Sequence, residues 1–427
     1  MQTTTTDFIT LGRQHLSPVL GRYFERGFVR GDGHYLYDVE DKAYLDFACG
    51  IAVTVLGHRH PAVTEAIVRQ ADTLLHTCNA LGYLEPVSEL AAAIAAVMPD
   101  PLDTVFFANS GSEAIEGAIK LARRVTGRPG IVAFTGAFHG RTMGAVALTS
   151  SSLNYRTGYE PLLPGVYLAP FPNVYAAGGD EARATADALA ALRRLFETQI
   201  PASEVAAVVI EAIQGEGGYN PAPVAFLQGL RQLCDEHGIL YVADEVQCGY
   251  GRTGRMWGFE HAGVVPDVVC LAKAIANGLP LSAVVSRREL QDRWGKGAHG
   301  TTFGGNPVAC AAGLAVLRTV REQDLVANAA VRGEELLAGL RDLAARDAGI
   351  GDVRGRGLMV GVEFVDPVTR RPDGGRCERV MQACADRGLL VLSCGGEHQV
   401  IRWIPPLDVA ADEIRRGLSI FEEALAA

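Results

Sequence analysis

The chain has 427 residues, a formal net charge of −10 at pH 7 and 21% charged residues. This length allows two or three domains of roughly 100 to 200 residues each. The acidic balance argues against nucleic acid or an anionic membrane surface as a partner, and every apolar run is far shorter than the ~20 residues that cross a bilayer. The polar start, residues 1–8, lacks the pattern of a secretory signal, so we expect a cytoplasmic location and small-molecule partners.

Nine cysteines are present, an odd number, and none forms a CxxC pair. We therefore predict reduced, mostly buried thiols. His58 and His60 stand two residues apart in GHRHP, but no cysteine or carboxylate cluster nearby completes a metal site. We interpret this segment as a turn and expect no metal.

The first sixty residues contain two short β-type runs, 35–39 and 43–47, separated by turn-like residues. This pattern predicts a hairpin-rich arm over 1–60. From residue 61 onward, helical patterns alternate with short apolar strands at 105–108, 131–134, 208–210, 240–243 and 268–271. Such alternation predicts an α/β domain over 61–315, with a mainly parallel sheet covered by helices.

A second, smaller domain is expected over 316–427. Asn306 followed by Pro307 predicts the start of the helix that leads into it. Its further elements are a helical region at 328–346, strand-like runs at 358–364 and 389–392, and a last helix ending near Ala426.

A polar turn follows the strand that ends at Ala108. It reads Asn109-Ser110-Gly111-Ser112-Glu113 and leads into a helical pattern over 114–124. Gly111 allows the backbone to approach an anion, and Ser112 adds a hydroxyl at the positive end of the helix. A phosphate group would be well placed there. A plain helix N-cap is the alternative, because serine is a favoured cap.

Two later strands end in residues suited to a cofactor. Asp244 follows the strand 240–243, which places a carboxylate at its end; a solvated acidic loop is the alternative. Lys273 follows the strand 268–271 and has apolar and small neighbours. These neighbours predict a partly buried amine with a lowered pKa, whereas an isolated lysine is more often a surface residue.

Together these features match the needs of pyridoxal 5'-phosphate: a phosphate anchor, a partner for the ring nitrogen and an amine that forms a Schiff base. Ionised Asp244 would keep the ring nitrogen protonated, so that the ring accepts electrons when a proton leaves the substrate α-carbon. The segment 249–254, GYGRTG, fits the dinucleotide template GxGxxG, but no helical pattern follows it. We interpret it as a loop.

Eight ordered motifs, spread over nearly the whole chain, carry a resemblance to a known family. They are DFACGIAV, NSGSEA, GAFHGRT, EAIQGEGG, VADEVQCGYGRTG, CLAKAIANGLPL, TTFGGNP and IRWIPPL. With these motifs the chain resembles the class III, or ω-, aminotransferases among the fold-type I pyridoxal-phosphate enzymes. The resemblance implies a large domain with a mainly parallel sheet and a smaller α/β domain.

The resemblance also implies most of the cofactor contacts. Lys273 would carry the cofactor, and Asp244 would hold its ring nitrogen. Thr302 of TTFGGNP would reach the phosphate from the neighbouring subunit, so a homodimer with its active site at the subunit interface is implied. The other implied contacts are Gln247 near the ring hydroxyl, Val246 and Phe138 on the two ring faces, and Gly111 and Ser112 at the phosphate.

Two arginines stand where the family binds carboxylates, Arg141 in GAFHGRT and Arg402 in IRWIPPL. In several family members the counterpart of Arg402 binds an α-carboxylate, or else pairs with the glutamate of an EPVQGEGG-like motif, which we assign to Glu211. Such a switchable pair would let one site accept an ω-amino acid in one half-reaction and glutamate in the other. A purely structural ion pair is the alternative.

The combination of Ile51, Arg141, Glu211 and Arg402 most resembles the 4-aminobutyrate aminotransferase branch, and acetylornithine and ornithine enzymes share much of it. Two residues depart from those usual in relatives. Ala212 stands in place of a frequent proline, and Cys248 in place of a frequent threonine, so they bear on the branch and not on the chemistry.

We therefore predict a ping-pong transaminase acting on amino acids and 2-oxo acids. In it the substrate amine displaces Lys273, the freed lysine moves the α-proton, and 2-oxoglutarate takes up the amino group. An amino-acid racemase or epimerase on the same scaffold is the main alternative, because the cofactor supplies the same chemistry. A decarboxylating transaminase and a non-catalytic pyridoxal-phosphate-binding protein are the remaining alternatives.

Overall fold

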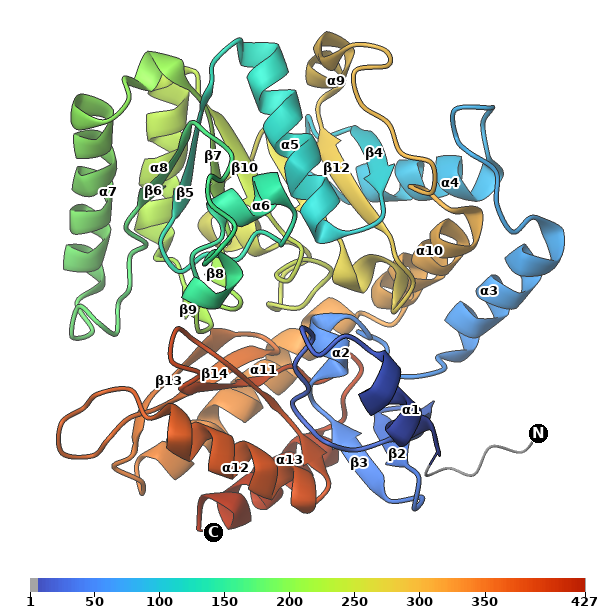
Figure 1. The fold of residues 1–427 in the computed structure, drawn as a ribbon, viewed down its shortest axis with the longest axis vertical. Helices are drawn as coiled ribbons and strands as arrows, with labels where there is room; N and C mark the ends of the chain where they lie inside the picture. The colour runs from blue at the N-terminus through green and yellow to red at the C-terminus, as the bar shows by residue number, and fades with distance from the viewer. Residues whose placement is uncertain (1–6, 427) are drawn as a thin grey trace.

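The computed structural model describes residues 7–426, and Figure 1 shows them as two stacked parts. The upper part holds a large sheet with helices packed on it. In the lower part the N-terminal strands, drawn in blue, lie beside the C-terminal helices, drawn in red. The two ends of the chain therefore build one part together, and the middle of the chain builds the other.

A seven-stranded sheet forms the centre of the upper part. Within this sheet β12 alone runs antiparallel to its neighbours, so the predicted mainly parallel sheet is confirmed, although sequence reasoning did not find β6 or β12. In spatial order the strands are β4 (Thr104–Ala108), β12 (Ser282–Ser286), β11 (Val268–Leu271), β10 (Leu240–Asp244), β7 (Val205–Ile210), β5 (Gly130–Phe134) and β6 (Val166–Ala169).

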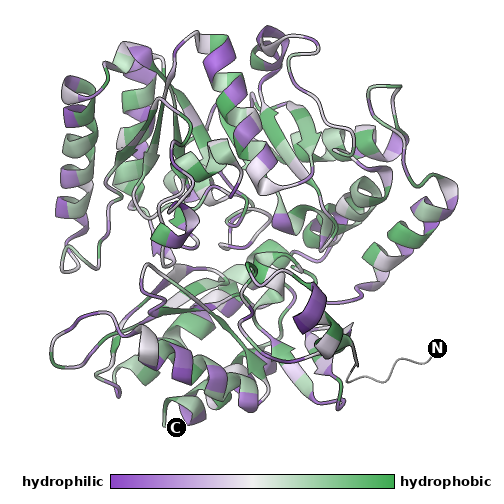
Figure 2. Cartoon of the chain, in the orientation of Figure 1, coloured by the Kyte–Doolittle hydropathy of each residue, from purple (hydrophilic) through white to green (hydrophobic). Residues whose placement is uncertain are grey.

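The central strands are buried on both faces. Val208 and Tyr241 belong to one hydrophobic core, whereas their chain neighbours Val209 and Val242 belong to the other. Strands covered on both sides read as continuous apolar runs, such as VAAVVI in β7, and not as alternating ones. Figure 2 shows these strands as predominantly hydrophobic.

Helices cover the two faces of the sheet. On one face lie α5 (Gly111–Thr126), α6 (Met143–Leu148) and α9 (Arg288–Trp294). On the other lie α4 (Glu85–Ala95), α7 (Glu181–Thr198), α8 (Val224–His237) and α10 (Pro307–Glu322), and α3 (Pro61–Thr73) packs against α10.

Two helix starts show how local sequence sets the boundaries. The predicted start at Asn306 is confirmed, because its side chain accepts hydrogen bonds from the backbone N–H groups of Val308 and Ala309. The start of α5 was predicted too late: the helix begins at Gly111, and Ser110 is its N-cap. Ser110 and Glu113 stand in the S-x-x-E spacing typical of a helix start, a signal that the sequence did contain.

The lower part contains two four-stranded sheets. One is antiparallel and runs in the order β13 (Ile350–Arg356), β14 (Met359–Phe364), β17 (Val400–Trp403) and β16 (Leu392–Cys394). The other runs in the order β1 (Phe28–Asp32), β2 (Tyr35–Asp38), β3 (Ala43–Asp46) and β15 (Leu389–Leu390). The helices of this part are α1 (Asp7–His15), α11 (Leu325–Ala344), α12 (Gly374–Asp386) and α13 (Ala411–Leu425).

The run 389–392, predicted as one strand, is two strands in two different sheets. Leu389 and Leu390 pair with β3 of the arm, whereas Leu392 begins β16 in the antiparallel sheet. The fully buried Val391 lies between them. All four residues are apolar because each position is buried, so the pattern of hydrophobicity does not show where the chain changes sheets.

The remaining elements are short. A hairpin is formed by β8 (Ile213–Gln214) and β9 (Asn220–Pro221), and a single turn, α2, covers Cys49–Ala52. One-turn 3-10 helices occur at Leu153–Tyr155, Ala202–Glu204, Gly258–Ala262 and Lys273–Ala276. The segment 249–254 is a loop, as predicted.

Other expectations from the sequence can be compared with this fold. The nine cysteines are free thiols, and eight of them are buried, as predicted. Within residues 7–426 no helix combines the length and the apolar character needed to span a bilayer. The predicted boundary between the second and third domains, at residues 315 and 316, falls inside α10, which packs against α3 and α4. The division into three domains stays a prediction.

His34 joins the N-terminal strands to the last helix. Its Nδ1 lies 2.8 Å from Glu413 Oε2, and its Nε2 lies 3.0 Å from Asp408 Oδ1. Burial alone would lower the pKa of His34, but the two carboxylates outweigh burial and raise this pKa to about 9. The protonated imidazole therefore links the N-terminal arm to Asp408 and to α13 through two ion pairs.

Because the folded-state pKa of His34 lies above the ordinary value of 6.5, its contribution to stability is complete below pH 6.5 and is lost as the pH rises through about 9. We expect His34→Gln to lower the free energy of unfolding by on the order of 2 kcal/mol at pH 6 and by much less at pH 10. Thermal unfolding followed from pH 6 to 10 measures this difference. The exposed His15→Gln is the control, and a loss in His34→Gln that is constant with pH would contradict the expectation.

Candidate active site

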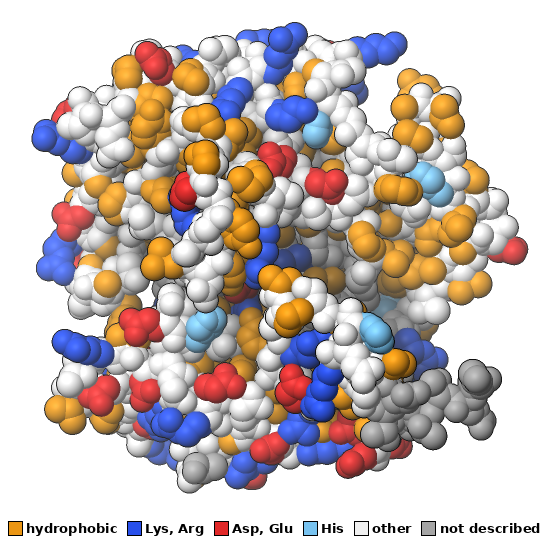
Figure 3. All heavy atoms as spheres, viewed as in Figure 1, with side chains coloured by type: hydrophobic (Ala, Val, Ile, Leu, Met, Phe, Trp, Pro, Cys, Tyr) orange, Lys and Arg blue, Asp and Glu red, His pale blue; other side chains and the backbone are white. Residues whose placement is uncertain are grey.

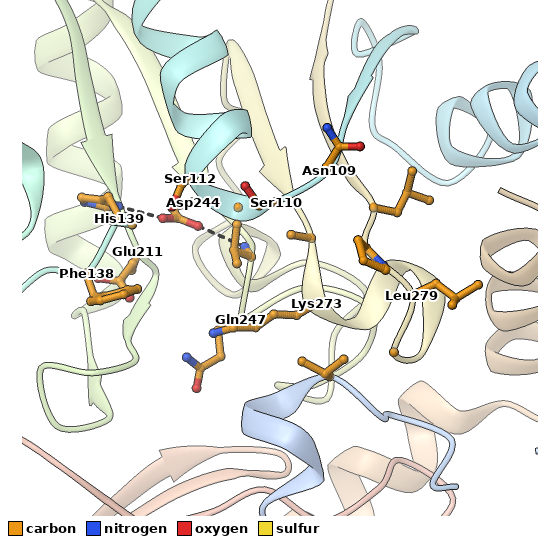
Figure 4. A pocket seen from close by; sticks show the side chains of 18 residues that line it. Asn109, Ser110, Ser112, Phe138, His139, Glu211, Asp244, Gln247, Lys273 and Leu279 are labelled. Atoms are coloured by element: carbon orange, nitrogen blue, oxygen red, sulfur yellow. Dashed lines mark hydrogen bonds and ion pairs between the residues drawn. The ribbon is translucent and has the colours of Figure 1, made fainter. Parts of the chain in front are cut away.

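A cavity of about 330 Å³ opens at the carboxyl ends of the central strands. Figure 3 shows the surface hollowed between the two parts of the molecule, and Figure 4 shows the side chains that line the cavity. In open parallel sheets this is the edge at which ligands bind. The lining comes from 109–112 after β4, 138–140 after β5, Glu211 after β7, Asp244, Val246 and Gln247 at β10, 272–273 after β11, 278–281, and Val53 of the arm.

Helix α5 points its N-terminus into this cavity. Two glycines keep that end open. A Cβ on Gly111 would lie 3.0 Å from Val246 Cγ1, and one on Gly140 would collide with Ser112 Oγ. The unpaired N–H groups and the dipole of a helix N-terminus favour a negatively charged ligand. Gly111 and Ser112 therefore lie where the sequence predicted a phosphate cradle.

Asp244 lies at the end of β10, almost completely buried. Its Oδ2 is 2.7 Å from His139 Nδ1, and its Oδ1 accepts a hydrogen bond of 3.0 Å from the Val246 backbone N–H. Burial disfavours a charged imidazole, but the hydrogen bond and the charge of Asp244 outweigh burial and raise the pKa of His139. Figure 4 shows His139 directed at Asp244. The carboxylate is thus fixed in one orientation at the cavity.

Lys273 follows β11 and faces the same cavity. Its φ of +48° lies in the left-handed region, which costs a residue other than glycine about 1 kcal/mol or more. Burial lowers the pKa of its amine; the charge of Glu216 opposes this shift, and that of Arg402 adds to it. The lowered pKa agrees with the prediction made from the apolar neighbours of Lys273.

Glu211 lines the cavity but does not contact Arg402. Its carboxylate accepts hydrogen bonds from the backbone N–H groups of Phe138 (3.1 Å) and Gly215 (2.9 Å). Burial raises the pKa of Glu211 to about 7, while the charge of His139 acts in the opposite direction. Glu211 therefore links the segment after β5 to the segment after β7 by hydrogen bonds.

The predicted Glu211–Arg402 pair is wrong, because Arg402 pairs with Glu216 instead. Glu216 lies in the turn of the β8–β9 hairpin, and its backbone carbonyl accepts a hydrogen bond from Gly395 N, next to β16. This contact turns Glu216 toward the sheet that carries Arg402, whereas Glu211 precedes the hairpin and is held by the large sheet. The motif contains two glutamates, and their spacing alone did not distinguish them.

The Arg402–Glu216 pair is largely buried. Arg402 is fully inaccessible to solvent and also donates a hydrogen bond of 3.1 Å to Tyr23 Oη of the arm. Burial opposes the charged carboxylate, but Arg402 outweighs burial and lowers the pKa of Glu216. The charges of both members of the pair act on the pKa of Lys273, which lines the cavity.

Three other predicted residues lie outside the cavity lining of this single chain. Arg141 is exposed, and its guanidinium carbon stands 4.4 Å from the centre of the Tyr155 ring. Ile51 belongs to the turn α2, two residues before Val53, which does line the cavity. Thr302 is exposed in a turn next to Thr301, whose hydroxyl accepts a hydrogen bond from Asn109.

Sequence reasoning missed several residues of the site. Ser110 could have been found from its capping spacing, and His139 from its place in GAFHGRT, one residue after Phe138. Glu216 was visible as the second glutamate of EAIQGEGG. No sequence pattern identifies Tyr23 or Val53, because both belong to the N-terminal arm and reach the site only through the tertiary contact between the arm and the rest of the chain.

These groups fit pyridoxal 5'-phosphate. The α5 N-terminus suits a phosphate, Asp244 suits a protonated ring nitrogen, and Lys273 supplies an amine of lowered pKa for an aldehyde. The cavity volume of about 330 Å³ lies within the range of roughly 300–1,000 Å³ for small-molecule sites. The fold and the site together define a pyridoxal-phosphate-dependent enzyme.

The chain belongs to the family described as aminotransferase class-III, whose model matches residues 21–425. It is 41% identical to the 5-aminovalerate aminotransferase of Pseudomonas aeruginosa and to the 4-aminobutyrate aminotransferase of Escherichia coli, with 92% of this chain and of each relative covered. It is 43% identical to the acetylornithine aminotransferase of Methanopyrus kandleri, over 93% of this chain and 94% of that one. The protein is therefore a pyridoxal-phosphate-dependent aminotransferase, and the resemblance drawn from the motifs is confirmed.

A solved structure agrees with this assignment. An amine transaminase from an uncultivated Pseudomonas species, in its PLP-bound form, matches the fold with a TM-score of 0.89 and 34% identity over 94% of each chain. The predicted fold-type I architecture is confirmed.

The contact between His139 and Asp244 can be tested through cofactor binding. Loss of a hydrogen bond to a buried charged group costs about 1.5–3 kcal/mol, so we expect His139→Ala to weaken the binding of pyridoxal 5'-phosphate by roughly tenfold to a hundredfold. His139→Asn keeps an N–H near the position of Nδ1 and should weaken binding less. Equilibrium dialysis of the cofactor measures both variants. Equal affinity in His139→Ala and the unmodified protein would refute this role of His139.

Proposed function

We propose that the protein transfers the amino group of an ω-amino acid of the 4-aminobutyrate type to 2-oxoglutarate by a ping-pong reaction. The observation that carries this proposal is the buried Arg402–Glu216 pair beside Lys273. The names of the 5-aminovalerate and 4-aminobutyrate relatives support it. The acetylornithine relative makes a longer substrate the second candidate.

The residues of the site divide the chemistry among them. When bound, pyridoxal 5'-phosphate withdraws electrons from the bond broken at the amine-bearing carbon. Lys273 is the base placed to remove and return that proton, because its lowered pKa favours the neutral amine. Asp244 holds a negative charge at the place of the ring nitrogen, and Gly111 and Ser112 hold the phosphate. Phe138 and Val246 give the ring apolar contacts.

The two amino donors differ in one carboxylate. An ω-amino acid has none next to its amine, and Arg402 then stays neutralised by Glu216. Glutamate carries an α-carboxylate at that place, which displaces Glu216 and binds the guanidinium of Arg402 in a bidentate manner. The switching role that we first assigned to Glu211 thus falls to Glu216.

Arg141 binds the far carboxylate of both substrates in this proposal. Its guanidinium is exposed, rests on the ring of Tyr155, and has no carboxylate partner within residues 7–426. Tyr155 in turn lies near enough to Glu216 and Arg402 for their charges to affect its pKa. In this proposal Arg141 and Arg402 bind the two carboxylates of glutamate, and Ile51 of the arm bounds the path of the substrate.

The active enzyme in this proposal is a cytoplasmic homodimer. Thr302 is exposed and does not line the cavity of its own chain, and its neighbour Phe303 is 62% exposed. Leu81 and Tyr83 expose large apolar side chains as well, 81% and 102%. Exposed apolar side chains of this size are typical of surfaces that a partner covers. Thr302 then contacts the phosphate bound by the second subunit.

A substrate panel tests the proposed reaction. We expect the cofactor-loaded protein to form glutamate from 2-oxoglutarate with 4-aminobutyrate and 5-aminovalerate, and Lys273→Ala to form none. N-acetylornithine, ornithine and single-enantiomer α-amino acids complete the panel, with glutamate and optical rotation followed in each case. Glutamate from N-acetylornithine alone would move the substrate to the acetylornithine class, and loss of optical activity without an oxo acid would make the enzyme a racemase.

The switch is tested by Glu216→Gln, which leaves the charge of Arg402 without its partner whenever an ω-amino acid is bound. We expect KM for 4-aminobutyrate to rise at least about tenfold, which corresponds to about 1.4 kcal/mol, while KM for glutamate stays the same or falls. Steady-state kinetics of the two half-reactions provide the measurement. Glu363→Gln is the matched control, because it removes another buried carboxylate that pairs with an arginine, Arg354, in the same sheet. Equal changes for both substrates would exclude the switch.

A further inference from the structure

Tyr219 is a buried tyrosine in a backbone conformation that tyrosine rarely adopts. It precedes β9 in the turn of the β8–β9 hairpin, its φ is +54°, and no part of it is accessible to solvent. Its ring is packed among Ile213, Met359 and Val400. A bulky residue in the left-handed region costs about 1 kcal/mol or more, and glycine or asparagine would avoid this cost. This unfavourable backbone conformation therefore indicates that the tyrosine side chain has a specific role at position 219.

Among the described residues, the hydroxyl of Tyr219 has one hydrogen-bond partner. It donates to Gln247 Oε1 over 2.6 Å, a normal length for an O–H···O bond and short for an N–H···O bond. The amide of Gln247 is therefore oriented with its oxygen toward the tyrosine. Burial raises the pKa of Tyr219 far above its ordinary value, so the phenol keeps the proton that it donates.

The other end of the same amide is free. Within residues 7–426, Gln247 Nε2 makes no hydrogen bond, and Gln247 lines the cavity together with Lys273. Gly215 lets the amide fit, because a Cβ at that position would collide with Nε2. Figure 4 shows Gln247 on the opposite side of Asp244 from Ser110 and Ser112.

The covalent structure of the cofactor determines which of its atoms faces the N–H donor of Gln247. In pyridoxal 5'-phosphate the aldehyde carbon stands opposite the ring nitrogen, with the phosphate arm on one side of it and a ring hydroxyl on the other. With the phosphate at α5, the nitrogen at Asp244 and the aldehyde at Lys273, the hydroxyl is left facing the side of Gln247. A fixed N–H there stabilises negative charge on the hydroxyl oxygen.

We propose that Tyr219 is a positioning residue that holds the amide of Gln247 with its N–H donor toward the ring hydroxyl of the cofactor, and so keeps that oxygen anionic beside Lys273. This inference rests on the proposed placement of the cofactor contacts. It does not depend on which amino donor the enzyme uses.

The proposal predicts the direction of a spectroscopic shift. When the nitrogen that joins Lys273 to the cofactor loses its proton, the ring oxygen carries its negative charge without a neighbouring positive charge. A donor to that oxygen therefore stabilises the deprotonated form and lowers the pKa of the linkage. Tyr219→Phe leaves the Gln247 amide free to turn over, so we expect this pKa to rise by at least about half a unit.

The measurement is an absorbance titration of the cofactor-loaded protein without substrate. Tyr250→Phe is the matched control, because Tyr250 is also buried with a positive φ of +59°, and its hydroxyl has no hydrogen-bond partner in the described part of the chain. We expect this control to titrate like the unmodified protein. Gln247→Leu should raise the pKa as well, and adding Tyr219→Phe to it should change the pKa no further, because the two residues act in series.

Two results would overturn the proposal: an unchanged pKa in Tyr219→Phe, or the full effect of Tyr219→Phe in a Gln247→Leu background. Thermal midpoints of Tyr219→Phe and Tyr250→Phe show whether both variants are folded. Since no substrate enters the titration, a failed substrate panel would leave this result standing, and a shift here would not by itself support the ω-amino acid assignment.

Discussion

Burial of charge is the constraint on which the site depends. Asp244, Glu211 and Glu216 lie with Arg402 around Lys273, and water reaches them poorly. Burial penalises the charged form of each group, so a charged group persists there only with a partner. An imidazole contacts Asp244, backbone amides bind Glu211, and Arg402 and Glu216 bind each other. Lys273 has no such hydrogen-bonded partner within residues 7–426, and its pKa is lowered. Among the described residues, the amine of Lys273 is thus the one group of this cluster without a hydrogen-bonded partner.

The stretch 211–219, made up of Glu211 and most of the short hairpin after β7, carries three of the interactions that organise this cluster. Glu211 ties it to the segment after β5, Glu216 ties it to Arg402 in the antiparallel sheet, and Tyr219 ties it to Gln247. This stretch of about ten residues therefore links the large sheet to the lower part of the molecule beside the cavity. These contacts share one stretch of backbone. The departures from family residues at Ala212 and Cys248 fall in the same region: a Cβ on Gly258 would touch both side chains.

The sequence predicted the large sheet well because both faces of its strands are buried, so each strand is a continuous apolar run that ends at a polar residue. The same logic located Asp244 and Lys273, since each directly follows such a run. It did not locate partners that depend on tertiary contacts. Glu211 and Glu216 are five residues apart in one motif, and only the turn of the hairpin decides which of them meets Arg402. The split of residues 389–392 was hidden for a related reason, because full burial in two sheets gives the same apolar pattern as burial in one.

The N-terminal arm contacts the turn that begins at Lys273, and several residues with positive φ angles lie on both sides of this contact. Cys49, Ile51 and Ala52 all have positive φ, and Ile51 is β-branched, so the turn α2 is unfavourable by itself. Hydrogen bonds hold it at both ends: Asp46 Oδ1 accepts from the first residues of the turn, and Asn277 bridges Leu56 N and Gly57 O just beyond it. Asn277 belongs to the turn that begins at Lys273 and has a positive φ of its own. The N-terminal arm is thereby bonded to the turn that begins at Lys273, and relaxation of one turn would require a change in the other.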